Sequence, residues 1–110
     1  MEFITLNEQV LLLAIWRLKD NAYGVTIREK VVEATRKKIV YGTLYNSLDK
    51  LVKKGYVATM KGEPTRERGG RSKIYYSLTE EGKLALQKSR ELQTSLWKGI
   101  PHFAMGGDEE

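Results

Sequence analysis

The sequence predicts a mainly helical fold with a small β-hairpin, an α+β class, from three observations. Four segments have helical spacing of apolar residues or helix-capping residues. Two short segments are rich in β-forming residues, and a loop of arginines and glycines joins them. The predicted order is therefore helix, helix, helix, strand, basic loop, strand, helix. The length of 110 residues fits one domain.

The first predicted helix covers residues 5–19, where Thr5 or Asn7 can cap the free N–H groups of the first turn. Thr5 and Glu8 also have capping-box spacing. Residues 10–16 are apolar on all sides of this helix, which predicts burial on more than one face. A central helix of a monomer satisfies this pattern, and so does a helix whose second face packs on another subunit. The small size of the domain favours the second arrangement.

Turn-forming residues at 20–24 end that helix, and a second helix is predicted over residues 25–36, with Ile27, Val31 and Ala34 as its buried stripe. A third helix is predicted over residues 41–54, before Gly55. Its apolar stripe is predicted to contain Leu44, Tyr45, Leu48, Leu51 and Val52. The opposite face presents hydrogen-bonding side chains first and cations later.

The hairpin is predicted to consist of strands 56–61 and 73–78, joined by a loop over residues 62–72 with three arginines and three glycines. Thr79 is predicted to cap a fourth helix over residues 80–97. One side of this helix carries Ala85, Ser89, Leu92, Leu96 and Ile100. We expect residues 1–78 to form one unit, residues 79–103 a dimerisation helix, and residues 104–110 a flexible tail.

Three helices followed by a hairpin form a winged helix-turn-helix, in which the third helix enters the DNA major groove. Residues 22–78 hold 13 basic and 5 acidic residues, whereas the two ends together are acidic. This distribution indicates a surface for a polyanion, although cations that only solvate helix faces would give the same balance.

The predicted DNA-binding residues precede the third helix, lie on its polar face, or lie on the hairpin. They are Lys37, Lys38, Tyr41, Thr43, Asn46, Ser47, Lys50, Arg66, Arg68, Arg71 and Lys73. Asn46 is the best candidate for a bidentate contact to an adenine edge, and ordinary surface polarity is the alternative for Asn46 and Ser47. Arginines at the tip of the wing suit the minor groove or phosphates.

Composition argues against several other classes. The chain has no cysteine and a single histidine, His102, so we expect no disulfide, metal centre, cofactor or catalytic triad, and no enzyme. The longest apolar run is seven residues, too short to cross a bilayer, and no secretion signal is recognisable, so we expect a cytoplasmic protein. Some winged helices bind proteins or structured RNA instead of DNA, but the basic third helix and wing of this chain favour DNA.

Several short motifs, taken in order, resemble the PadR family of bacterial transcriptional regulators. They are Tyr23-Gly24, Gly42-Thr43-Leu44-Tyr45 with Leu48 and Leu51, Lys54-Gly55-Tyr56-Val57, Gly69-Gly70-Arg71, and Tyr75-Tyr76-Ser77-Leu78-Thr79 with Gly82. The resemblance covers about residues 6–85 and implies a homodimeric repressor that binds a near-palindromic operator in double-stranded DNA. Val40 and Tyr41 depart from the family pattern, because many relatives have serine or proline before the Gly-Thr-Leu-Tyr segment.

The same resemblance implies that the last helix packs on the first helix of a partner subunit. The predicted interface residues are Leu12, Ile15, Trp16, Leu92, Leu96 and Trp97. Some compact relatives bind flat aromatic molecules between subunits, beside a tryptophan of the last helix, which implies a small aromatic effector here. Trp97 lies about one turn later than that pattern expects. The alternative is that both tryptophans fill the dimer core.

Overall fold

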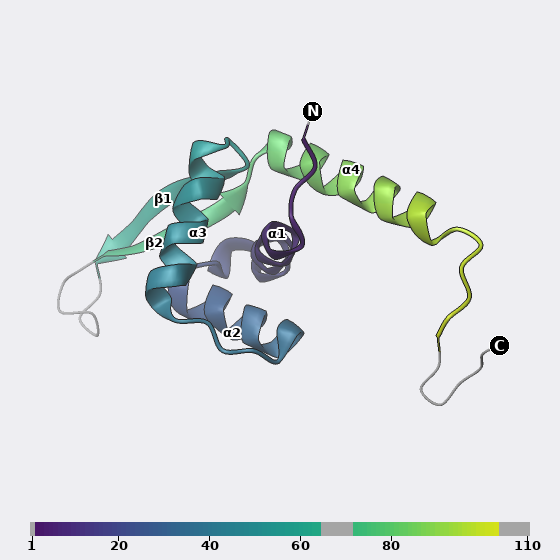
Figure 1. The fold of residues 1–110 in the computed structure, drawn as a ribbon. Helices are drawn as coiled ribbons and strands as arrows, with labels where there is room; N and C mark the ends of the chain where they lie inside the picture. Colours follow the sequence, from purple (N-terminus) through teal and green to yellow (C-terminus); the bar gives the residue numbers. More distant parts are fainter. Residues whose placement is uncertain (1, 65–71, 104–110) are drawn as a thin grey trace.

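The computed structural model describes residues 2–64 and 72–103, and its elements follow the predicted order (Figure 1). They are α1 (Leu6–Leu18), the short 3₁₀ helix η1 (Lys19–Asn21), α2 (Gly24–Thr35), α3 (Tyr41–Lys53), β1 (Val57–Pro64), β2 (Ser72–Leu78) and α4 (Glu80–Trp97). The two strands form one antiparallel sheet. The predicted mainly helical fold with a β-hairpin is thereby confirmed.

The core is built around α1, which contacts α2, α3, β2 and α4. It contributes Leu11, Leu12, Ala14 and Ile15, all of them buried. These side chains meet a leucine stripe of α3, apolar residues of α2, and inward-facing residues of both strands. Burial of α1 on more than one face is therefore achieved largely within one chain. Leu13 and Trp16 of the same helix remain 38% and 49% exposed.

The capping predictions are confirmed at the start of α1 and α4. The Glu8 amide donates to the Thr5 hydroxyl at 3.1 Å, and the Thr5 amide donates to Glu8 Oε1 at 2.8 Å, a complete capping box. The Gly82 amide donates to the Thr79 hydroxyl at 3.0 Å. These bonds satisfy N–H groups that the first turn of a helix leaves free.

Two members of the predicted apolar stripes are not buried. Ala34 is exposed, because the buried residues of α2 end at Val31 and the last turn of that helix does not reach the core. Tyr45 is 41% exposed, because its ring stacks on Tyr41 at the edge of the domain instead of entering the leucine core. The corresponding predictions for Ala34 and Tyr45 are wrong.

The hairpin is longer than predicted, since β1 continues to Pro64 and β2 begins at Ser72. Val57 pairs with Leu78 and Lys61 with Ile74, and the register shifts between Lys61 and Pro64. Part of the predicted loop over residues 62–72 is therefore strand. The tip, residues 65–71, lies outside the described residues, and so do the predicted tail residues 104–110.

α4 packs on α1 of the same chain as far as Gln93, and its last residues lead away from the body (Figure 1). Gln9 Oε1 of α1 accepts hydrogen bonds from Ser89 Oγ at 2.9 Å and Gln93 Nε2 at 2.7 Å. Ser89 is buried by this contact. α4 therefore contacts α1 of its own chain, and the predicted contact with the first helix of a partner subunit stays a prediction.

Candidate nucleic-acid interface

The leucine stripe of α3 fixes which side of that helix faces outward. Leu44, Leu48 and Leu51 are 0%, 0% and 1% exposed. Because neighbouring residues on a helix are separated by about 100°, this burial turns the opposite side to the surface. The predicted contact residues Thr43, Asn46 and Lys50 are exposed there, Ser47 is half-buried, and Tyr41 is exposed on the flank of the stripe beside Tyr45. Their hydrogen-bonding groups and cation suit base edges and phosphates in a major groove.

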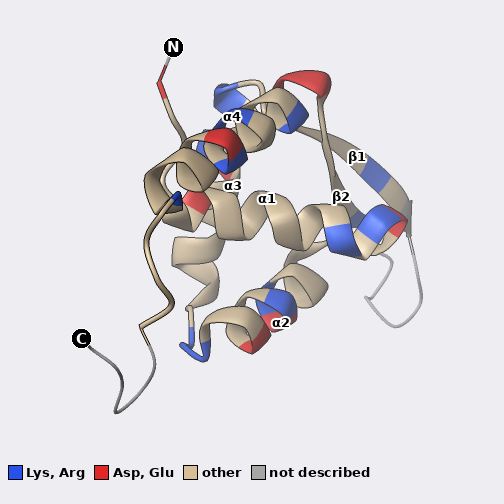
Figure 2. Cartoon of the chain, turned by 90° about the vertical axis from the view of Figure 1, so that its right-hand side faces the viewer, with Lys and Arg blue, Asp and Glu red and all other residues tan. Residues whose placement is uncertain are grey.

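The turn between α2 and α3 lies beside this face. Lys37 and Lys38 are exposed, and they line a recess of about 220 Å³ together with Thr43 and Ser47 of α3. Figure 2 shows Lys and Arg at the end of α2 and again on β1. The structure therefore brings four predicted contact residues together, two ammonium groups from the turn and two hydroxyls from the helix.

The first turn of α3 is held by side chains from elsewhere. Val40, the residue before the helix, provides no side-chain cap. Arg28 of α2 instead donates from Nε to the Ile39 carbonyl at 2.6 Å, and its guanidinium carbon lies 5.1 Å from the centre of the Tyr41 ring. The Tyr41 and Tyr45 rings stack with centres 6.1 Å apart and planes inclined by 24°.

The wing contributes Lys73, whose ammonium lies 4.1 Å from the centre of the Tyr23 ring. Tyr23 also makes an edge contact with Tyr75, with ring centres 5.6 Å apart. This contact holds Lys73 against the body of the domain, beside the start of α2. The other predicted wing residues, Arg66, Arg68 and Arg71, lie outside the described residues.

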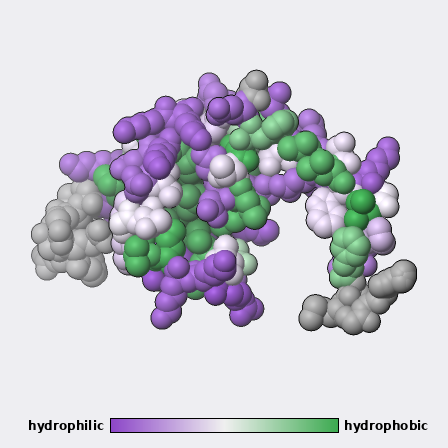
Figure 3. Space-filling view, viewed as in Figure 1, coloured by the Kyte–Doolittle hydropathy of each residue, from purple (hydrophilic) through white to green (hydrophobic). Residues whose placement is uncertain are grey.

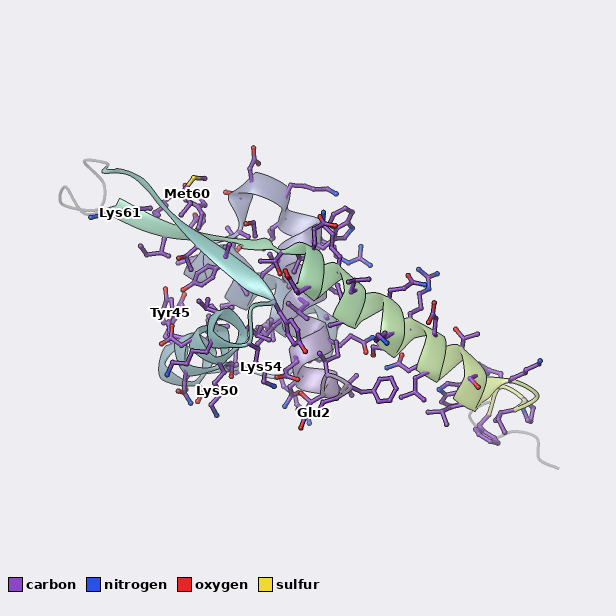
Figure 4. All side chains as sticks on the ribbon, turned by 90° about the horizontal axis from the view of Figure 1, so that it is seen from above. Glu2, Tyr45, Lys50, Lys54, Met60 and Lys61 are labelled. Carbon is purple, nitrogen blue, oxygen red and sulfur yellow. The ribbon has the colours of Figure 1, made fainter. Side chains whose placement is uncertain are left out.

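Three residues that the sequence interpretation omitted from the predicted DNA-binding set belong to this region. They are Tyr45, Lys61 and Arg28. Figure 4 shows Tyr45 on α3, near the predicted Lys50, and Lys61 on the hairpin, all on the half of the molecule opposite the free end of α4. Spacing of four residues between Tyr41 and Tyr45 could have revealed their stacking. Because successive side chains of a strand point to opposite faces, the strand pattern could have identified Lys61 as an exposed cation of the hairpin. No local signal connects Arg28 to Ile39, since 11 residues separate them.

The six predicted interface residues fall into two groups. Leu12 and Ile15 are 0% and 2% exposed and belong to the core of the protomer, so they offer no surface to a partner. Trp16, Leu96 and Trp97 are exposed, and Leu92 is half-buried. Figure 3 shows apolar residues along α4 and over the centre of the body. The prediction is corrected for the two core residues.

A groove of about 490 Å³ lies between α1 and α4. Leu13, Trp16 and Leu86 form apolar parts of its lining, and Lys83 and Arg90 add cations. Gln9 and Gln93, which hydrogen-bond to each other, lie in the same lining. The groove therefore combines an aromatic ring, aliphatic carbon and positive charge.

Other kinds of site are not found in the described part of the chain. Within residues 2–64 and 72–103, no three His, Asp or Glu side chains lie together so that they could hold a metal ion. No helix among the described residues is long and apolar enough to span a membrane.

Comparison with known proteins agrees with this architecture. The family model of the transcriptional regulator PadR-like family matches residues 12–88. No curated protein matches the chain significantly. Among solved structures, the chain is similar to RosR of H. salinarum, with 26% identity, a TM-score of 0.68, and coverage of 89% of this chain and 81% of that one.

Two further structures are similar over most of their length. A Streptococcus transcriptional regulator is 26% identical, with a TM-score of 0.68 and coverage of 86% of this chain and 87% of that one. A PadR family transcription regulator from Clostridium difficile R20291 is 26% identical, with a TM-score of 0.63 and coverage of 83% and 91%. Because the family model spans well over half of the sequence, the chain belongs to the PadR-like family of transcriptional regulators.

Proposed function

We propose that this protein is a sequence-specific regulator that binds double-stranded DNA, and that it represses transcription as a homodimer in the cytoplasm. The outward face of α3, with Thr43, Asn46 and Lys50 exposed above a fully buried leucine stripe, carries this proposal. A major groove admits one helix, and such side chains can hydrogen-bond base edges or phosphates.

In this proposal, α3 reads bases while the surrounding cations fix its position on the duplex. Asn46 offers a bidentate contact to adenine, and Thr43 and Ser47 offer hydroxyls. Lys37, Lys38 and Lys50 neutralise phosphates, and the wing over residues 62–72 meets the minor groove or the backbone. Because each neutralised phosphate releases counterions, affinity should fall steeply as salt rises.

The homodimer is proposed to form through Trp16, Leu92, Leu96 and Trp97, with residues 79–103 as the dimerisation segment. Leu96 and Trp97 are 65% and 60% exposed, and large exposed apolar side chains on one helix are typical of an interaction surface. Two-fold symmetry would then place the two reading helices about one turn of DNA (~34–36 Å) apart. The operator is therefore expected to be near-palindromic.

The groove between α1 and α4 supports the proposal of a small aromatic effector. Trp16 provides a ring for stacking, and Arg90 and Lys83 provide positive charge. A ligand that changed the angle of α4 would change the spacing of the two reading helices and so release DNA. Operator affinity that does not respond to aromatic ligands at constant salt would contradict this part.

The test is a mobility-shift titration with DNA from upstream of the protein's own gene, at two salt concentrations and with excess nonspecific competitor. Asn46→Ala should lose discrimination of about 1–3 kcal/mol at its base, whereas Lys50→Ala should weaken binding to all sequences and lower the salt slope by about one. Lys88→Ala, on the exposed side of α4, is the control.

The outcomes separate the proposal from its rival. Competitor-resistant binding that depends on Asn46 and Lys50 supports a sequence-specific regulator. Binding that nonspecific DNA abolishes contradicts specific reading of the tested DNA. No binding even at low salt would favour a winged-helix module for protein–protein interaction.

A further inference from the structure

We infer that Arg28 is a positioning residue that holds the first turn of α3, and Tyr41 in particular, in the geometry needed to read DNA. The inference rests on the proposed function for its DNA part and on contacts within the free protein for the rest. Arg28 lies on α2 and reaches across the turn that joins the two helices. It is half-buried there and does not lie on the outward face of α3.

The start of α3 needs such a support because its own sequence supplies none. Helices usually begin with a side chain that accepts from the free N–H groups of the first turn. Val40 cannot do this, in contrast to the threonine caps of α1 and α4. The first backbone bond of α3, from the Leu44 amide to the Val40 carbonyl, is 3.0 Å long. Because no side chain of residue 40 caps the helix, the geometry of the first turn of α3 depends on the contacts that hold residues 39–41.

Arg28 fixes this segment at two points. Its Nε donates to the Ile39 carbonyl at 2.6 Å, which anchors the backbone two residues before the helix. Its guanidinium faces the Tyr41 ring with 5.1 Å between the carbon and the ring centre. Tyr41 then stacks on Tyr45, one helical turn further on. Tyr41 therefore contacts both the Arg28 guanidinium and the Tyr45 ring at the start of α3.

Charge alone does not explain the position of Arg28. The amino-terminal end of a helix carries partial positive charge, so a cation placed beside it is unfavourable. Among the described residues, no carboxylate forms an ion pair with Arg28. The hydrogen bond to Ile39 and the contact with Tyr41 must therefore hold it in place. A planar guanidinium can donate in its plane and stack with its face at the same time, which an ammonium cannot do.

Through these contacts, Arg28 affects how α3 recognises DNA without touching the DNA itself. Tyr41 is 42% exposed and lies in the first turn of α3, five residues before Asn46. Release of the Ile39 carbonyl would let the first turn fray and move the Tyr41 ring. Specific contacts are sensitive to such shifts, whereas attraction of the duplex to cations is not.

The experiment compares Arg28→Lys and Arg28→Met with wild type, with Arg17→Lys and Arg17→Met as controls. Arg17 is an exposed arginine in the last turn of α1. Amide hydrogen exchange of the free protein at Leu44 and Tyr45 reports the first turns of α3. Exchange at Tyr76, whose amide donates to the Ala22 carbonyl at 2.8 Å, reports the hairpin and core. Operator affinity is then titrated at several salt concentrations.

Both Arg28 variants should speed exchange at Leu44 and Tyr45 by about tenfold, with Tyr76 unchanged, because a hydrogen bond to a charged group is lost. Both should weaken specific binding by about tenfold, and Arg28→Lys should keep the wild-type salt slope. The Arg17 variants should match wild type in the exchange measurement.

Three results would overturn the inference. If Arg28→Lys matches wild type in exchange and affinity, Arg28 acts only through its charge. If exchange rises equally at Tyr76, Arg28 is a general stability residue. If amide exchange rises only in α3 and specific affinity stays unchanged, the Arg28 contacts hold the first turn of α3 but play no part in DNA recognition. Should wild type bind no DNA, the proposed function fails by itself, and the exchange data still decide whether Arg28 holds the turn.

Discussion

The Lys54 ammonium, at the carboxyl end of α3, forms an ion pair with the Glu8 carboxylate in the first turn of α1. The Glu8 side chain is 16% exposed and the Lys54 side chain 46%. Burial by itself raises the pKa of Glu8, but the hydrogen bond from Lys54, the bond from the Thr5 amide and the nearby positive charge outweigh it, so the pKa is lowered. The same hydrogen bond raises the pKa of Lys54.

Glu8→Gln should lower the free energy of unfolding by about 1 kcal/mol near neutral pH. Glutamine can keep the capping box with Thr5, so the substitution removes mainly the ion pair. Because the pKa of Glu8 is lowered in the folded state, its contribution is present above the ordinary value of 4.5 and is lost as pH falls through the folded value.

Urea unfolding of wild type and Glu8→Gln, near neutral pH and in strong acid, measures this. Glu33→Gln is the matched control, since it removes the exposed pair with Lys30. We expect the control to change stability by less than about 0.5 kcal/mol. A difference between wild type and Glu8→Gln that persists undiminished in strong acid would contradict the role of the charge.

Gly82→Ala should destabilise the protein by about 1–3 kcal/mol, because an added Cβ would lie 2.2 Å from the Tyr56 carbonyl oxygen. That oxygen belongs to the backbone and cannot move aside alone. Gly42→Ala is the matched control in α3, where a Cβ meets nothing within 4 Å. It should stabilise by up to about 1 kcal/mol, since alanine favours helix. Thermal unfolding followed by circular dichroism compares the two, and equal shifts would refute the steric argument.

Tyr76→Phe should reduce the loss of stability in alkaline solution. Burial raises the pKa of the Tyr76 hydroxyl, and the nearby Tyr45 and Asp49 act in the same direction. The fold therefore favours the neutral form, so this contribution is complete below the ordinary pKa of 10.0 and declines as pH rises above it. Urea unfolding on both sides of this pH tests the sign, with Tyr41→Phe as an exposed control. A steeper alkaline loss in Tyr76→Phe would refute it.

Leu96→Glu should weaken self-association by about tenfold or more while the protomer stays folded, because Leu96 is 65% exposed. Thr94→Glu adds the same charge nearly opposite on α4 and serves as the control. Sedimentation across a range of concentrations measures the association, and circular dichroism checks the fold. If both variants sediment like wild type, the interface does not include the Leu96 side of α4.

The sequence predicts the helices and strands well, but it predicts less well which segments they pack against. Repeated leucines in α3 and threonine caps are local signals, and both lead to the observed elements. The sequence places Leu12 and Ile15 at a subunit interface, in keeping with an α1 that is apolar on every side. Periodicity cannot say whether an apolar side meets the same chain or another, and here α2, α3 and the hairpin cover them. The contacts of Arg28 and Gln9 join segments that are distant in the sequence, so no local pattern predicts them.

Thr79 connects the two helices that the proposed function assigns to DNA and to the partner subunit. Its hydroxyl caps α4 and donates to the Gly55 carbonyl at 2.6 Å, while its amide donates to the Tyr56 carbonyl at 3.1 Å. Gly55 and Tyr56 directly follow the end of α3. The start of α4 is therefore joined directly to the residues that end α3, so a displacement of the first turn of α4 would act on the carboxyl end of α3 without passing along the hairpin.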